Sequence, residues 1–215
     1  MKQALTLLSL LLGLAITSTA QSKIKASDII KQINEGHDVA YTNVEIEGNL
    51  DLTDLQNRTK APHSNTWLRH FDGDDNTFVS TVNVSLTFTN CTFLDDVLAY
   101  YHLNHSRETF VANFEKGVVF KNCNFDRASE FKYSQFEGVA TFAGSAFKEE
   151  ANFKYTHFPV QTSFQQATFY GLANFKYSKF SAPVNIESVA FKGIEDFKYT
   201  RIDGRSFTSY LLEKR

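Results

Sequence analysis

The chain has 215 residues, among them Phe 21, Tyr 9, Trp 1 and Met 1, and a net charge of −2. Charged residues at 21% and hydrophobic residues at 42% exclude a disordered chain, and the lack of a basic surplus argues against general nucleic-acid binding. One dominant type of large side chain indicates a single packing environment that is repeated many times.

Residues 1–20 have the pattern of a cleaved secretory signal peptide. Lys2 supplies a positive charge, a largely apolar run follows from Leu5 to Ile16, and Ser18 and Ala20 are small residues suited to a cleavage site. The run is too short for a membrane-spanning helix of about 20 apolar residues, and no later segment reads as a span. We therefore expect an exported protein, periplasmic or secreted, whose mature chain begins at Gln21 and has no transmembrane segment.

Residues 21–43 are expected to form a capping helix and a lead-in to the rest of the chain. Ser27 is a candidate N-cap for a helix over 28–35. Ile29, Ile30 and Ile33 lie on one face of this helix, and Gly36 suits its C-terminal end. Such a helix would cover one open end of a repeat structure.

A regular spacing of large apolar residues governs the chain from Phe120 onward. Steps of five and six residues alternate between Phe120, Phe125, Phe131, Phe136, Phe142, Phe147, Phe153, Phe158, Phe164, Phe169, Phe175, Phe180, Ile186, Phe191, Phe197 and Ile202. The tripeptide Phe-Lys-Tyr recurs every 22 residues, which is four such steps. We therefore expect the chain to wind around a four-sided coil, each step forming one side.

The residue two positions before each large residue is small in most steps, as at Ser129, Ala151 and Ala173. Residues at i and i−2 point to the same side of an extended segment, so one large and one small residue point inward on each side of the coil. A helix is excluded, because these steps drift away from a 3.6-residue period.

The segment 44–202 is expected to hold the whole repeat structure, with two insertions. The run from Phe88 to Phe93 matches the run from Phe120 to Phe125 but lies 32 residues earlier, which predicts one coil plus an insertion of about ten residues at 94–108. Leu50 and Leu55 are expected on two sides of a first coil, followed by a polar insertion at 56–81. Some five coils result, a rod of roughly 25 Å at about 4.8 Å per coil. Residues 203–215 are expected to close the far end with a short helix.

These residues resemble the pentapeptide-repeat family, whose motif centres on Leu or Phe with a small residue two positions earlier. The resemblance covers about 46–202 and implies an all-β fold, a right-handed quadrilateral β-helix, here with a short N-terminal capping helix. The chain departs from the family pattern because Phe replaces the commoner Leu and every second side carries one extra residue.

The best understood members of this family mimic duplex DNA and bind DNA gyrase. That role needs a strongly negative rod in the cytoplasm, whereas 110–202 carries eleven Lys or Arg against nine Asp or Glu and the chain is expected to be exported. Gyrase mimicry is therefore disfavoured.

Cys91 and Cys123 take the same small inward position in consecutive coils. Stacked coils would hold their Cα atoms about 4.8 Å apart, within the range of a disulfide, and an exported protein meets oxidising conditions. Two interpretations stay open here: a disulfide, or two small residues in a column that also holds Ser145, Ala167 and Val189.

The Phe-Lys-Tyr units place four lysines in one outward column and four tyrosines in the neighbouring one. These residues are Lys132, Tyr133, Lys154, Tyr155, Lys176, Tyr177, Lys198 and Tyr199. One interpretation is a stripe that binds anionic glycans or lipid headgroups, with tyrosine as a stacking surface. The other is a solvated face with packed corner tyrosines, diluted by Glu130, Glu149 and Glu150.

Metal-binding and modification signals are weak. Residues 72–76 begin like a calcium loop, but Thr77 replaces the turn glycine and no Glu closes the loop at Asn83. The histidines that could ligate a metal are His63, His70, His102 and His105, without a clear third ligand in the pattern. Glycosylation triplets begin at Asn57, Asn83, Asn90 and Asn104. No metal and no cofactor is expected.

The sequence holds no nucleophile elbow, no paired-histidine zinc motif and no phosphate loop. We therefore expect a non-enzymatic solenoid that binds or scaffolds an unidentified protein or glycan partner, and not nucleic acid. The alternative is a glycan-active or glycan-binding β-helix protein that uses the two insertions and the Lys/Tyr stripe.

Overall fold

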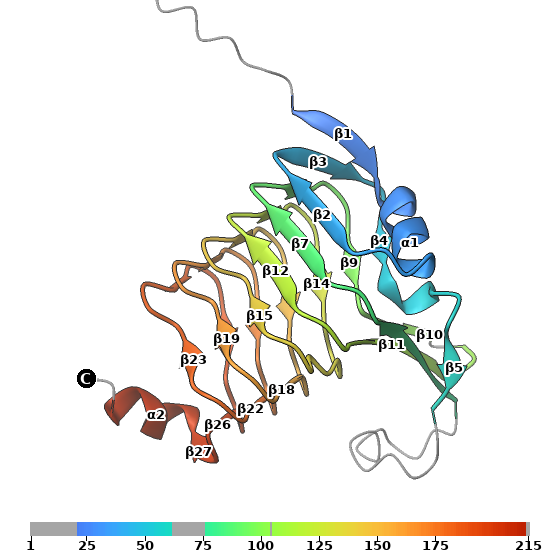
Figure 1. Cartoon of the computed structure of the whole chain (residues 1–215). Coiled ribbons are helices and arrows are strands. Elements are labelled where there is room, and N and C mark those ends of the chain that lie inside the picture. The colour runs from blue at the N-terminus through green and yellow to red at the C-terminus, as the bar shows by residue number, and fades with distance from the viewer. Residues whose placement is uncertain (1–20, 62–75, 104, 214–215) are drawn as a thin grey trace, which may run out of the picture.

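The computed structural model describes residues 21–61, 76–103 and 105–213, without the side chains of 211–213, so the expected signal peptide and most of the candidate calcium loop lie outside it. Figure 1 shows a stack of coils with one helix at each end, α1 (Ala26–Asn34) and α2 (Phe207–Glu213). The coils are built from short strands that pair in parallel with the strands of the next coil. The predicted all-β solenoid with a short N-terminal helix is therefore confirmed.

The first three sides of the solenoid are continuous sheets. The first side contains β2 (Val39–Thr42), β7 (Leu86–Thr89), β12 (Val118–Lys121), β15 (Ala140–Thr141), β19 (Thr162–Ser163) and β23 (Val184–Asn185). The second side contains β1 (Ser22–Lys25), β3 (Val44–Glu47), β8 (Thr92–Phe93), β13 (Asn124–Phe125), β16 (Ala146–Phe147), β20 (Thr168–Phe169) and β24 (Ala190–Phe191). The third side contains β4 (Leu50–Asp51), β9 (Val97–Leu98), β14 (Ser129–Glu130), β17 (Ala151–Asn152), β21 (Ala173–Asn174) and β25 (Glu195–Asp196).

The fourth side begins with isolated bridges and continues as a sheet. Phe114 pairs with Phe136, and the sheet holds β18 (His157–Phe158), β22 (Lys179–Phe180), β26 (Arg201–Ile202) and β27 (Arg205–Ser206). The first and third sides each have six strands, so the described chain forms six coils rather than the five expected.

The first coil, which was expected from Leu50 and Leu55, has large residues that are not phenylalanines. Tyr41 pairs with Phe88 on the first side, and Ile46 pairs with Phe93 on the second. Leu50 lies on the third side of the first coil, but it pairs with Val97 and therefore takes the position two before a large residue. Leu52, fully buried at the start of the short 3₁₀ helix Leu52–Asp54, follows two residues later and takes the large position.

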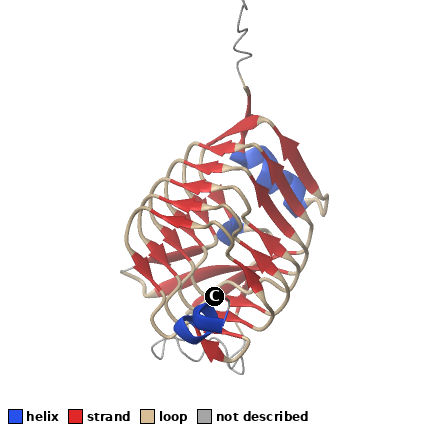
Figure 2. Cartoon of the chain, turned by 90° about the vertical axis from the view of Figure 1, so that its left-hand side faces the viewer, coloured by secondary structure: helices blue, strands red, loops and turns tan. Residues whose placement is uncertain are grey.

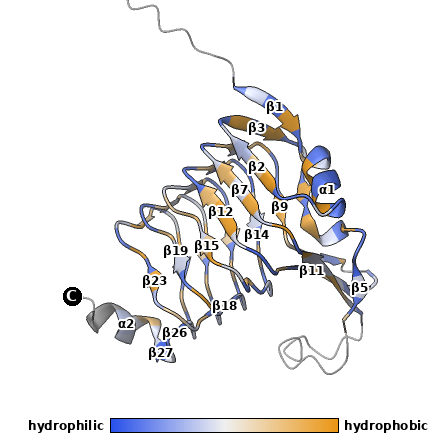
Figure 3. Cartoon of the chain, in the orientation of Figure 1, coloured by the Kyte–Doolittle hydropathy of each residue, from blue (hydrophilic) through white to orange (hydrophobic). Residues whose placement is uncertain are grey.

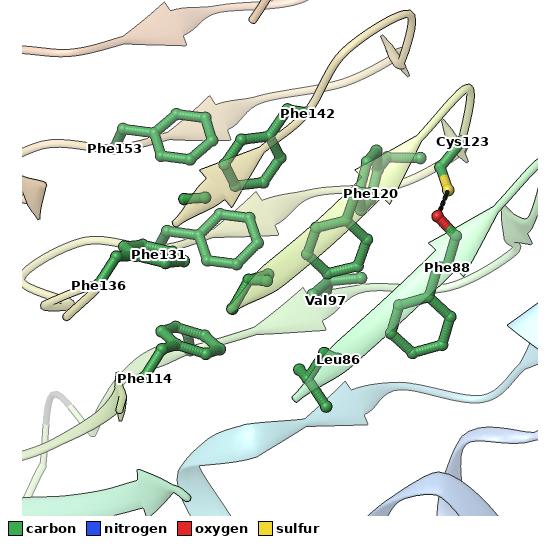
Figure 4. Close-up of a cluster of buried hydrophobic side chains, with 14 of the residues drawn as sticks. Leu86, Phe88, Val97, Phe114, Phe120, Cys123, Phe131, Phe136, Phe142 and Phe153 are labelled. Atoms are coloured by element: carbon green, nitrogen blue, oxygen red, sulfur yellow. Dashed lines mark hydrogen bonds between the residues drawn. The ribbon is translucent and has the colours of Figure 1, made fainter. Parts of the chain in front are cut away.

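The predicted inward phenylalanines form the core, as the close-up in Figure 4 shows for the middle coils. Phe120, Phe142 and Phe153 are fully buried. Equivalent rings of neighbouring coils stack, with centroids 5.5 Å apart for Phe120 and Phe142 and 5.0 Å apart for Phe142 and Phe164. Each buried Phe stabilises the fold by roughly 1.5–3 kcal/mol through burial, and ring pairs add about 0.5–1.5 kcal/mol. The hydropathy colouring of Figure 3 accordingly alternates between apolar strand residues and polar corners.

Both insertions leave the solenoid between its third and fourth sides. They form a sheet in the order β10 (Tyr100–Leu103), β11 (Glu108–Phe114), β6 (Thr77–Val82) and β5 (Thr59–Lys60). The second insertion begins later than expected, because Val97 and Leu98 still pair with β14 and Ala99 is buried. Phe110, which falls outside the regular spacing, stacks on Phe78 of this sheet with centroids 5.3 Å apart.

The N-terminal end is closed by β1 and α1. Ile24 pairs with Ile46, and Ile29 and Ile33 of α1 are buried. The helix begins two residues earlier than expected, so Ser27 lies inside its first turn and does not cap it; the N-cap is Lys25, without a side-chain hydrogen bond. This follows from β1, which pairs up to Lys25 and leads directly into the helix.

The C-terminal end is covered less completely than the N-terminal end. Figure 2 views the solenoid from this end and shows α2 across the lower part of the last coil. The helix occupies part of the expected cap, after a short return strand, β27, that pairs antiparallel with β26. Phe191 and Phe197 are only partly buried, in contrast to the equivalent residues of the middle coils.

Candidate functional site

The predicted Lys/Tyr stripe forms one continuous surface, here called the Lys/Tyr face. It consists of Lys132, Tyr133, Lys154, Tyr155, Lys176, Tyr177, Lys198 and Tyr199. Each pair follows the end of a third-side strand, at the corner that leads to the fourth side. The preceding phenylalanine of each unit points into the core, which directs the lysine outward because neighbouring residues of an extended chain alternate.

Polar side chains stabilise this corner at Lys154, Lys176 and Lys198. The backbone N–H groups of Lys154 and Lys176 donate hydrogen bonds to the side-chain oxygens of Asn152 and Asn174, with N–O distances of 3.2 and 3.3 Å. Asp196 accepts the equivalent bond from Lys198 at 2.9 Å. Such bonds from a short side chain to the backbone two residues on are typical of tight turns.

The tyrosines of the face have positive φ, from 58° at Tyr155 to 65° at Tyr199. This left-handed conformation costs about 1–2 kcal/mol for a residue with a side chain. The backbone N–H of Tyr133 donates to the carbonyl oxygen of Lys154 in the next coil at 3.0 Å, and Tyr155 and Tyr177 repeat this bond. These bonds between coils help to offset the cost of the turn.

The four tyrosine rings stack along the solenoid. Ring centroids are 5.0 Å apart for Tyr133 and Tyr155, and 4.7 Å apart both for Tyr155 and Tyr177 and for Tyr177 and Tyr199. Because the inner rings cover one another's faces, Tyr155 and Tyr177 offer ring edges and hydroxyls to solvent rather than flat faces. The expected stacking surface is therefore restricted to the end of the column, where Tyr199 is 56% exposed.

The lysine charges lie beside these rings. The Nζ atoms are 4.8, 5.2, 5.5 and 5.1 Å from the ring centroids of Tyr133, Tyr155, Tyr177 and Tyr199. Burial lowers the pKa of Lys154, and the charges of Lys132 and Lys176 lower it further. An anion bound along the column would relieve this repulsion between like charges.

A cluster that the spacing did not reveal closes the N-terminal end of the face. The Lys132 Nζ donates to the Tyr100 hydroxyl at 3.1 Å and lies 4.5 Å from its ring centroid. Asn152 donates to a carboxylate oxygen of Glu130 at 2.9 Å. Tyr100 belongs to the second insertion, so only the path of the insertion brings it here. Glu130 could have been found from its column, in which Asn152, Asn174 and Asp196 follow it.

Three pKa values in this cluster are perturbed. Burial raises the pKa of Tyr100, and the Glu130 carboxylate raises it further. Burial raises the pKa of Glu130 from its usual 4.5 to about 7, and the nearby Glu150 carboxylate adds to the shift. Burial lowers the pKa of Lys132, against an opposite effect of Glu130. Glu130 and Lys132 are thus two partly buried, electrostatically interacting groups next to Tyr100.

The two cysteines lie next to each other in adjacent coils, and both are free, buried thiols. The backbone N–H of Asn124 donates to the carbonyl of Cys91 at 2.8 Å, and the Cys123 Sγ lies 3.4 Å from the carbonyl oxygen of Phe88, as Figure 4 shows. A hydrogen bond from Cys123, the largest effect, lowers the pKa of Cys91 to about 6 and raises that of Cys123. The disulfide considered from the sequence is not formed in this structure.

The remaining sequence signals are structural or lie outside the described residues. His102 Nδ1 is 3.0 Å from the Thr109 hydroxyl, while His63 and His70 are not described. The described residues contain no group of three side chains that could hold a metal ion. Asn90 belongs to a ladder with Asn43 and Asn122, whose amides bond at 3.0 and 3.2 Å. In the described part of the chain, no helix is long and apolar enough to cross a membrane.

Comparison with known proteins identifies the repeats. A family model described as pentapeptide repeats (9 copies) matches residues 112–157 and 131–179. No curated protein and no solved structure matches the chain significantly. The matched region contains three of the four Lys-Tyr pairs of the face, so the repeat itself sets their spacing.

Proposed function

Residues 112–179 belong to the pentapeptide-repeat family, and from this premise we propose that the protein is an exported, non-enzymatic binding module that holds an anionic partner on its Lys/Tyr face. The repeat solenoid is in general a structural and interaction module. Export is inferred from the signal-like residues 1–20.

The regular column of four lysines carries this proposal. The column repeats once per coil, about 4.8 Å, so a linear ligand with regularly spaced negative charges would match it. The stacked tyrosines fix the lysine stems, which lowers the entropy that a partner must remove on binding. The core behind the face is packed with phenylalanine rings, which favours binding on the outer surface.

Binding of an anionic ligand tests the proposal through two interior lysines. The Lys154→Glu, Lys176→Glu double variant should lose binding to an array of anionic glycans, because it reverses two charges at the centre of the face. Wild-type binding should also weaken as salt rises, since exposed charges are screened.

The matched control is the Lys116→Glu, Lys121→Glu variant. It makes the same charge change at exposed positions on the first side and its preceding corner. Binding should be lost only in the first variant, with both variants retaining the melting temperature of the wild type to within a few degrees. Equal binding by the two variants would contradict a role for the Lys/Tyr face.

A glycan-active enzyme is the second candidate, favoured by the perturbed pair Glu130 and Lys132 beside the insertion residue Tyr100. Incubation of the wild type with acidic and neutral polysaccharides tests it. Release of reducing ends that disappears in Glu130→Gln would overturn the non-enzymatic proposal.

A further inference from the structure

A recess lies at the C-terminal end of the Lys/Tyr face, between the last coil and the return strand. It is lined by Phe197, Lys198, Tyr199, Thr200, Arg201, Ser206, Phe207 and Thr208. The chain reverses at Asp203 and Gly204, which have φ of 49° and 73°. This reversal places β27 antiparallel to β26 and brings 206–208 against the last coil.

The floor of the recess is closely packed and mostly apolar. Phe207 stacks on Phe197 with centroids 3.8 Å apart and planes within 6°, and Phe197 stacks on Phe175 of the previous coil at 5.0 Å. Thr200 is buried, and its hydroxyl donates to the Phe175 carbonyl at 2.6 Å. Stacked rings and a buried hydroxyl thus form the floor of the recess.

The rim combines two cations with hydroxyl groups and an exposed ring. Lys198 and Arg201 are both exposed. Two nearby acidic groups have partners of their own: Asp196 accepts a hydrogen bond from the backbone N–H of Lys198, and Asp203 pairs with Arg205 at 3.2 Å. The ring of Tyr199, at the end of the stack, is the most accessible aromatic surface of the face.

We propose that this recess binds an acidic sugar, a pyranose ring that carries a carboxylate. The carboxylate would lie between Lys198 and Arg201, because a guanidinium matches the two oxygens of a carboxylate. The sugar ring would lie against Tyr199, and the hydroxyl of the exposed Thr208 would exchange hydrogen bonds with the hydroxyls of the sugar.

This inference rests on the proposed function and specifies its ligand. From the recess, the lysine column runs back along the solenoid through Lys176 and Lys154. Further acidic sugar units of the same polymer would each meet the next of these lysines. The expected ligand is thus an extended polymer of acidic sugars with one end in the recess.

Calorimetric titration with tetragalacturonate tests the inference, with its methyl ester as the uncharged control of the same shape. The wild type should bind the acid and bind the ester at least about tenfold more weakly, because the ester lacks the charge-assisted bonds. Dextran sulfate that competes as well as the tetragalacturonate at equal charge would overturn the assignment to acidic sugars.

Two variants locate the site. Lys198→Gln, Arg201→Gln removes both charges, and Tyr199→Asn removes the ring while keeping a residue that tolerates the left-handed backbone. Each should weaken binding about tenfold or more, while Lys116→Gln, Lys121→Gln should bind as the wild type does. The exposed positions of all these lysines and of Arg201 allow each charge variant to fold.

The outcomes separate the two proposals. Binding that is lost in Lys154→Glu, Lys176→Glu but unchanged in both recess variants would overturn the recess and leave the Lys/Tyr face in place. A wild type that binds none of the anionic probes would overturn both.

Discussion

The tyrosines of the Lys/Tyr face occupy a left-handed backbone conformation that Gly or Asn adopts more easily. The stacking of their rings offsets part of the free-energy cost of this conformation. The opposite corner shows the alternative, because Asn43, Asn90 and Asn122 take the same conformation there and bond to one another through their amides. Tyrosine at this position is therefore not required by the turn alone. Its retention in four coils supports a role for the ring.

Glu130 is the residue whose ionisation should affect stability most clearly. Its pKa is raised in the folded protein, so stability is full below about pH 4.5 and is lost as the pH rises to about 7, where the folded-state carboxyl also ionises. Glu130→Gln should abolish this dependence. Relative to the variant, the wild type should lose on the order of 2–3 kcal/mol of unfolding free energy between about pH 4 and about pH 8, measured by urea denaturation. Parallel pH profiles for the two proteins would contradict a buried, perturbed Glu130.

The element that repeats is a short side of the coil followed by one of two corners. From Phe120 onward, each five-residue step has a left-handed residue at its corner, such as Asn122 or Tyr133, and the six-residue steps have none. The extra residue replaces the left-handed turn as the way to change direction. This explains why the alternation of five and six is regular, and why the large residues nevertheless all point inward.

Each side of a coil contributes one large residue. The stability lost when this residue is replaced by Ala should depend on the place of its coil in the stack. Phe153 is fully buried, with Phe131 and Phe175 stacked on its two faces at 5.1 and 4.9 Å. Phe153→Ala should cost about 3–5 kcal/mol in chemical denaturation. Phe191→Ala, at a partly exposed position of the last coil, should cost less than half as much. Equal losses would show that the last coil is as well packed as the middle of the stack.

At the scale of the whole molecule, the two ends differ. Ile24, Ile29 and Ile33 cover the first coil, whereas Ile186, Val189 and Phe191 of the last coil remain partly exposed. In a repeat protein each coil is stabilised mainly by its direct neighbours, so the coil with a partial cover is the least stable.

Native-state hydrogen exchange should reveal this difference. Amides bonded between the last two coils, such as those of Phe164 and Phe175, should exchange by local opening, faster than the equivalent amides of Phe131 and Phe142. The middle coils should exchange only by global unfolding. Uniform protection from the first coil to the last would contradict independent opening of the C-terminal end.

The sequence by itself determined the solenoid, the four-sided coil and the inward phenylalanines. These follow from local alternation along the strand and from a spacing that repeats in every coil, so no knowledge of distant contacts is needed. The same spacing placed the eight residues of the Lys/Tyr face in two adjacent columns. Where the identity of the large residue changed, as at Tyr41, Ile46 and Leu52, the pattern became ambiguous, and the large residues of the first coil were not assigned correctly.

Only the tertiary structure decided what lies at the two ends of the Lys/Tyr face. Tyr100 reaches Lys132 because the second insertion leaves the solenoid at this corner, and the recess exists because the chain reverses at Asp203 and Gly204. Likewise, the stacking distance of the rings, and not their spacing in the sequence, leaves Tyr199 as the most exposed ring of the stack. Repetition fixes what every coil shares, whereas insertions and chain ends interrupt it, and their contacts depend on the path of the chain in space.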